Sequence, residues 1–194
     1  VFVVDASGSS ALHRMAEAKG AVELLLADCY VRRDEVAVIA FRLDQAEVLL
    51  PPTRSLLRAK RRLAALPGGG GTPLASALAQ TATLVAGLCR KGHAVQVIVL
   101  SDGKANVDRQ GQPGRQGAMA DAHATARILG TLAWGKARLA WVDTSPRPSQ
   151  EAQALAASMA AQYTTLPHAD AAGIHTLARQ LAHPAQPRAP TTRS

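Results

Sequence analysis

The chain has 194 residues, a length that suits one well-packed domain. Hydrophobic residues make up 47% of the sequence and aromatic residues only 3%, so the core must be built from Ala, Leu and Val. The net charge of +8 favours acidic partners, but the densest basic run, RAKRR at 58–62, has no interleaved aromatic residues to stack on bases. We therefore expect no nucleic-acid partner. A solvated helix face is the simplest interpretation of this run, and docking of a protein partner is the alternative.

Cysteine usage argues against a zinc centre. Cys29 and Cys89 are far apart in the sequence and form no Cys-x-x-Cys pair or Cys/His cluster. We expect both thiols to be reduced, buried and inert. The sequence has neither a signal peptide nor an apolar run long enough to span a membrane, which predicts a cytoplasmic protein.

The first stretch, VFVVDASGSS, consists of four apolar residues followed at once by Asp5 and three serines. Its abrupt start inside a strand predicts that the chain is a fragment of a longer subunit. Apolar residues at helical spacing then predict a helix from Ala11 to near Val31. The runs VAVIAF at 36–41 and AEVLL at 46–50 are joined by a tight polar turn, so they predict a β-hairpin.

The middle of the chain alternates between helical and strand patterns. Residues 53–65 predict a basic helix, and the run PGGGGTP at 67–73 separates it from an Ala/Leu-rich helix at 74–90. The strand AVQVIVL at 94–100 stops at the polar residues SDG. The Gly- and Gln-rich stretch at 104–117 then predicts a mobile surface loop.

The same alternation continues to the end of the chain. We expect a helix at 118–134, a strand at 138–143, a helix at 149–161, a strand at 163–166 and a final helix at 170–182. Residues 1–183 should form one domain, and the Pro-rich residues 184–194 should form a disordered tail.

Apolar strands that alternate with helices predict an α/β fold. We expect a doubly wound, mostly parallel sheet, with one antiparallel edge strand from the hairpin and helices on both faces. Ligands of such sheets bind beyond the carboxyl ends of the strands. Three polar stretches should meet at that edge, namely DASGS, GGGGT and SDG.

Five oxygen-bearing side chains belong to these three stretches: Asp5, Ser7, Ser9, Thr72 and Asp102. The first three are spaced by two residues, so in an extended segment they point the same way. Carboxylate and hydroxyl oxygens suit Mg²⁺, Mn²⁺ or Ca²⁺, and the lack of imidazole or thiolate disfavours zinc, copper and iron. Taken singly, the serines and Thr72 are also typical of helix N-caps, and the aspartates of turns. Their expected meeting at one edge favours a metal site.

The order DASGS, GGGGTPL and VIVLSDG resembles the von Willebrand factor A, or integrin I-like, domain with its metal-ion-dependent adhesion site, over residues 1 to about 183. Asp5, Ser7, Ser9, Thr72 and Asp102 match the metal ligands of that motif. The resemblance implies a bound Mg²⁺, with Mn²⁺ as a substitute. It also implies that an acidic residue of a partner protein completes the coordination of the ion.

Further motifs narrow the resemblance. PPTRS and RAKRRL before the glycine run, LSDGKANV and VDTSPRP look like the carboxy-terminal domain of the D subunit of magnesium chelatases, which serve chlorophyll and bacteriochlorophyll synthesis. The resemblance implies partners, an ATPase subunit and a porphyrin-binding subunit, and ATP-driven insertion of Mg²⁺ into protoporphyrin IX. A cobalt chelatase subunit and a free-standing ligand-binding module are the alternatives.

We expect this domain itself to be a non-catalytic adaptor within an enzyme complex. The glycine run lacks the Lys of a phosphate-binding P-loop, and Ser7 is not framed as a nucleophile elbow. A metal-dependent phosphatase is disfavoured because residue 7 is Ser where a D-x-D motif needs Asp. The six scattered histidines suit surface or satisfied positions. A basic docking surface, made of Arg58, Lys60, Arg61 and Arg62, would steer an acidic partner toward the ion.

Overall fold

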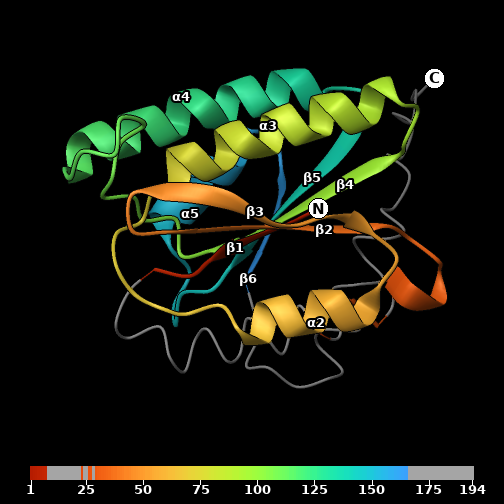
Figure 1. The fold of residues 1–194 in the computed structure, drawn as a ribbon. Coiled ribbons are helices and arrows are strands. Elements are labelled where there is room, and N and C mark those ends of the chain that lie inside the picture. The colour runs from red at the N-terminus through yellow and green to blue at the C-terminus, as the bar shows by residue number, and fades with distance from the viewer. Residues whose placement is uncertain (8–22, 24–25, 28, 166–194) are drawn as a thin grey trace, which may run out of the picture.

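The computed structural model describes residues 1–7, 23, 26–27 and 29–165. Ser9, most of the helix expected at 11–31, the helix expected at 170–182 and the tail at 184–194 lie outside the described residues. The described part is an α/β structure in which helices cover both faces of one sheet (Figure 1).

The sheet has six strands in the order β3-β2-β1-β4-β5-β6. They are β1 (Phe2–Asp5), β2 (Val36–Arg42), β3 (Gln45–Thr53), β4 (Val95–Ser101), β5 (Ala137–Asp143) and β6 (Gln162–Thr165). All neighbouring strands run parallel except the hairpin pair β2 and β3. The predicted doubly wound sheet with one antiparallel edge strand is therefore confirmed.

Four helices are described: α2 (Leu56–Ala64), α3 (Leu74–Arg90), α4 (Arg115–Ala133) and α5 (Gln150–Ser158). Figure 1 shows α3, α4 and α5 on one face of the sheet and α2 on the other. Successive strand side chains point to opposite faces, so β1 serves two cores. Val3 packs with the helices of the first face, and Phe2 and Val4 pack in the second core. Burial on both faces explains why β1 is a continuous apolar run.

Several boundaries differ from those expected. The strand β3 continues through Pro51 and Pro52 to Thr53, which delays the start of α2 to Leu56. Proline is tolerated there because β3 is an edge strand whose outer N–H groups need no partner in the sheet. Smaller shifts occur at α5 and β6, which begin at Gln150 and Gln162.

The loop expected at 104–117 is shorter than predicted, because α4 already begins at Arg115. Its tip is a tight turn in which Asp108 Oδ1 accepts hydrogen bonds from the backbone N–H groups of Gln110 and Gln112, each at 2.8 Å. Val107 and Pro113 form an antiparallel bridge across the turn. A carboxylate that accepts local N–H groups stabilises such a turn without help from the core.

Both cysteines are only partly buried, so the prediction of buried thiols was wrong. The Cys89 thiol donates to the carbonyl oxygen of Lys136 at 3.6 Å. None of the described helices combines the length and the apolar character that crossing a membrane requires.

Candidate metal centre

Asp5 ends the central strand β1 and is partly buried there. Its Oδ1 accepts hydrogen bonds from the backbone N–H and the hydroxyl of Ser7, at 2.9 and 2.6 Å. Its Oδ2 accepts the hydroxyl of Ser101 at 2.9 Å. Burial raises the pKa of Asp5 from 3.8 to about 6, the hydrogen bonds from Ser7 and Ser101 oppose this, and the nearby charge of Asp102 adds to it. Removal from water therefore disfavours the ionised form of Asp5.

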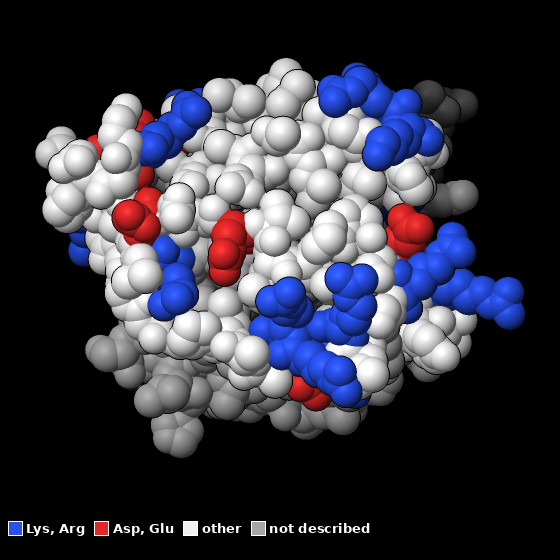
Figure 2. All heavy atoms as spheres, in the orientation of Figure 1, with Lys and Arg blue, Asp and Glu red and all other residues white. Residues whose placement is uncertain are grey.

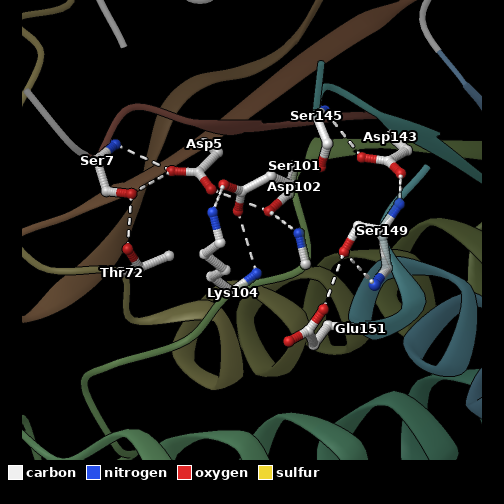
Figure 3. Close-up of polar contacts among 12 residues, drawn as sticks. Asp5, Ser7, Thr72, Ser101, Asp102, Lys104, Asp143, Ser145, Ser149 and Glu151 are labelled. Atoms are coloured by element: carbon white, nitrogen blue, oxygen red, sulfur yellow. Dashed lines mark hydrogen bonds and ion pairs between the residues drawn. The ribbon is translucent and has the colours of Figure 1, made fainter. Parts of the chain in front are cut away.

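Ser7 and Thr72 bring two hydroxyl oxygens to the same place. Ser7 Oγ and Thr72 Oγ1 lie 2.7 Å apart, as the dashed lines of Figure 3 show. Because the Ser7 hydroxyl donates its hydrogen to Asp5, its oxygen lone pairs remain available as acceptors. Thr72 does not cap α3: the N-cap residue is Pro73, and no side chain caps the helix.

The glycine run holds Thr72 in position. A Cβ at Gly71 would collide with the carbonyl oxygen of Leu43 and the Cγ2 of Val107, so only glycine fits there. The backbone N–H of Thr72 donates to Asn106 Oδ1 at 2.6 Å. Sequence reasoning did not identify Asn106. Its place in LSDGKANV, four residues after Asp102, was the available signal.

Asp102 lies just beyond the end of β4, with only 16% of its side chain exposed. Lys104 binds both of its carboxylate oxygens: its backbone N–H donates to Oδ1 and its ammonium to Oδ2, each at 3.1 Å. Sequence reasoning missed Lys104, which carries a positive charge at a centre predicted from anionic and hydroxyl groups. It also missed Ser101, which lies beside β1 because β1 and β4 pair in parallel.

A second polar cluster lies at the end of β5. The buried carboxylate of Asp143 accepts hydrogen bonds from the backbone N–H groups of Ser145 and Ser149 and from the hydroxyl of Tyr163, at 2.9, 2.7 and 2.6 Å. Burial, with the Asp143 contact next, raises the pKa of Tyr163. The Ser149 side chain caps α5 by accepting from the N–H of Ala152. Because both carboxylate oxygens of Asp143 accept hydrogen bonds, among them from backbone N–H groups within and directly after the VDTSPRP loop, this residue holds the loop in place.

The donors present suit a small hard cation. Adjacent ligands in an octahedron with 2.0–2.1 Å bonds are about 2.9 Å apart, close to the 2.7 Å between Ser7 Oγ and Thr72 Oγ1. With Asp5 and Asp102, the donors are two carboxylates and two hydroxyls, without nitrogen or sulfur. No three His, Cys, Asp or Glu side chains cluster in the part of the chain that the structure describes, so softer metals find no ligand group there. Ser9, the fifth predicted ligand, lies outside that part.

The predicted basic docking surface lies on a different element. Arg58, Arg61 and Arg62 are exposed on α2 and Lys60 is partly buried. The structure therefore does not bring these groups into the metal centre itself. In Figure 2 a concentration of basic side chains covers the region where Figure 1 shows α2. The loop after α2 leads to the centre, and the backbone N–H of Gly69 donates to the Ala6 carbonyl at 2.9 Å.

A comparison with protein families identifies the domain. Residues 1–104 match the family model described as von Willebrand factor type A domain. The chain belongs to this family. The match covers DASGS, the glycine run with Thr72, and Asp102, so the domain family and the resemblance seen in the sequence agree.

The most similar curated relatives include chelatase subunits. The domain is 46% identical to the magnesium-chelatase 60 kDa subunit of Cereibacter sphaeroides and 43% identical to that of Rhodobacter capsulatus, each over 88% of the chain. It is 53% identical to the magnesium-chelatase 67 kDa subunit of Chlorobaculum parvum over 55% of the chain. The chain spans only 30% of the length of the two 60 kDa relatives and 17% of the 67 kDa one.

Solved structures agree with the fold. The von Willebrand domain of the type V pili tip protein Mfa5 from Porphyromonas gingivalis has a TM-score of 0.68 at 12% identity, over 93% of both chains. A von Willebrand factor type A protein from Catenulispora acidiphila has a TM-score of 0.61 at 19% identity, over 92% of this chain and 40% of that one. At such low identity the likeness is one of fold alone.

Proposed function

We propose that this von Willebrand factor type A domain is a metal-dependent protein-interaction domain of a magnesium chelatase subunit. It would bridge the ATPase subunit and the porphyrin-binding subunit, and so support ATP-driven insertion of Mg²⁺ into protoporphyrin IX. The domain contributes binding rather than chemistry to this reaction. The resident cation of the domain is distinct from the Mg²⁺ that the complex inserts.

The observation that carries the proposal is the cluster of Asp5, Ser7, Thr72 and Asp102 at one sheet edge in a chain that resembles chelatase subunits. Ser7 and Thr72 would bind a Mg²⁺ or Mn²⁺ ion through their hydroxyl oxygens, while Asp5 orients Ser7 and supplies negative charge. The bound cation would accept a carboxylate of the partner as a further ligand. Mg²⁺ commonly keeps exchangeable positions of this kind.

The basic docking surface on α2 complements this centre. Arg58, Arg61 and Arg62 are exposed, and none of them forms an ion pair with a carboxylate among the described residues. A row of arginines raises the rate at which an acidic partner surface arrives, more than it raises the affinity. We assign the choice of partner to this surface and the dependence on metal to the centre.

A pull-down of the purified ATPase and porphyrin-binding subunits by this domain tests the proposal. We expect capture with Mg²⁺ and loss of capture when the ion is chelated. The variant Asp5→Asn should lose capture in Mg²⁺, because a neutral amide compensates less of the charge of the ion. Glu47→Gln is the matched control, since Glu47 is an exposed carboxylate on the edge strand β3.

Capture that persists after chelation, or in Asp5→Asn, would show that the partners bind without the metal. The same variants in a full-length subunit extend the test to the reaction. Undiminished chelatase activity with both Asp5→Ala and Ser7→Ala would contradict the proposal.

A further inference from the structure

Lys104 places an ammonium group at the candidate metal centre. Its Nζ lies 3.1 Å from Asp102 Oδ2, the contact drawn in Figure 3. The position follows from the backbone. Gly103 adopts a φ of +80°, and a Cβ there would collide with Ala152, so the turn after β4 is fixed and returns Lys104 to Asp102.

The charges of the centre balance differently with and without this lysine. Asp5 and Asp102 in their ionised forms carry two negative charges, and a divalent ion would neutralise them. With the Lys104 ammonium added, the metal-loaded centre has one excess positive charge. An incoming carboxylate removes that excess. Lys104 therefore disfavours binding of the cation but favours the later binding of a carboxylate to the metal-loaded centre.

We propose that Lys104 couples the two binding events: it weakens cation binding to the free domain and strengthens carboxylate binding to the metal-loaded domain. This inference rests on the proposed function of the same centre. The domain would then hold its ion tightly only when an acidic partner group is present. Coupling between two ligands is reciprocal, so the partner's carboxylate must raise the affinity for the ion by the same factor.

The geometry allows the movement that this coupling requires. The Lys104 side chain is 59% exposed, so its ammonium can leave Asp102 for solvent, whereas the Asp102 side chain is largely buried. The ion pair itself contributes little to folding because one partner is exposed. Removal of Lys104 should therefore affect ligand binding much more than the stability of the domain.

The first measurement is the affinity for Mn²⁺ alone, followed by electron paramagnetic resonance of the free ion, with Mg²⁺ as a competitor. We expect Lys104→Gln to bind Mn²⁺ about three- to tenfold more tightly than the wild-type domain, since one opposing charge near the surface is removed. Lys136→Gln is the matched control: Lys136 is exposed and directly precedes β5, at the opposite edge of the sheet. Its affinity for Mn²⁺ should not change.

The second measurement adds acetate as a carboxylate probe, with chloride at the same ionic strength as the reference. Acetate should raise the affinity for Mn²⁺ of the wild-type domain and of Lys136→Gln more than that of Lys104→Gln. Lys104→Arg retains the charge and should restore most of the wild-type response. High salt should reduce the difference between the variants, because exposed charges are screened.

Three outcomes separate the hypotheses. Tighter Mn²⁺ binding with a smaller acetate effect in Lys104→Gln supports the coupling. Equal or weaker Mn²⁺ binding in Lys104→Gln, with normal binding in the wild type, overturns the role of Lys104 and leaves the metal centre in place. If the wild-type domain binds no Mn²⁺, both the proposed function and this inference fail. Circular dichroism of each variant, with Lys104→Met as a second neutral substitution, identifies any loss of folding.

Discussion

Replacing Asp5 with Asn tests whether the negative charge of Asp5 destabilises the metal-free domain. Asparagine keeps the shape of the side chain and an oxygen that can accept both hydrogen bonds from Ser7. The Ser101 hydroxyl can rotate and accept a hydrogen bond from the new amide. The substitution thus removes the charge and leaves the local hydrogen bonds largely intact.

The size of the effect follows from the pKa of Asp5. Burial raises this pKa from 3.8 to about 6, so the folded state binds the proton more tightly than the unfolded chain. As the pH rises from 3.8 toward 6, the free energy of unfolding of the metal-free domain therefore falls, and above that range the loss is complete. A difference of about two pH units corresponds to about 3 kcal/mol. Asparagine cannot ionise and escapes this loss.

We expect Asp5→Asn to unfold at higher urea than the wild type at about pH 7.5 in EDTA, with a gain of up to about 3 kcal/mol. The gain should shrink to less than about 1 kcal/mol at pH 4, where Asp5 is protonated in the folded state and only partly ionised in the unfolded chain. Added Mg²⁺ should stabilise the wild type and not the variant. The reasoning would be refuted if Asp5→Asn were no more stable than the wild type in EDTA. It would also be refuted if the gain in the free energy of unfolding did not depend on pH.

Two further predictions concern the metal centre, and a third concerns the basic docking surface. Calorimetry should show that the affinity for Mg²⁺ falls by up to about tenfold per pH unit below about pH 6. The reason is that the ion then competes with a proton on Asp5. An affinity independent of pH would contradict this. Gly71→Ala should lower the free energy of unfolding in urea by about 1–3 kcal/mol and weaken Mg²⁺ binding, because the new Cβ collides with Leu43 and Val107. The control Gly117→Ala, which has open space around it on α4, should be neutral or stabilising. In surface plasmon resonance, Arg58→Glu with Arg61→Glu should slow association with the chelatase partners at low salt and leave Mg²⁺ affinity unchanged; an unaltered association rate would exclude steering by α2.

The fold was largely predictable from the sequence because its signals are local and strong. Continuous apolar runs such as VAVIAF are typical of strands buried on both faces, and they indicated a mostly parallel sheet covered by helices. The boundary errors arose where tertiary position overrides local preference. Pro51 and Pro52 read as the end of a strand, but they continue β3 because β3 is an edge strand.

The candidate centre was only partly predictable. Asp5, Ser7 and Thr72 were expected together, and their hydroxyl and carboxylate groups are joined by hydrogen bonds. Asp102 contributes to the raised pKa of Asp5, which places its charge nearby. Ser101 and Asn106 were missed because their roles depend on strand register and on a loop contact 34 residues apart in sequence, which residue type alone does not reveal.

Lys104 shows why a list of ligand types is an incomplete description of such a centre. A search for carboxylates and hydroxyls passes over a lysine, yet this ammonium binds the same carboxylate that a cation would need. Affinity depends on the total charge of the centre rather than on the ligands alone, since each charge acts on every other at these distances. Under the proposed coupling, the lysine beside Asp102 would weaken binding of the cation to the free domain without removing a ligand, so that the ion is held firmly only together with a partner carboxylate.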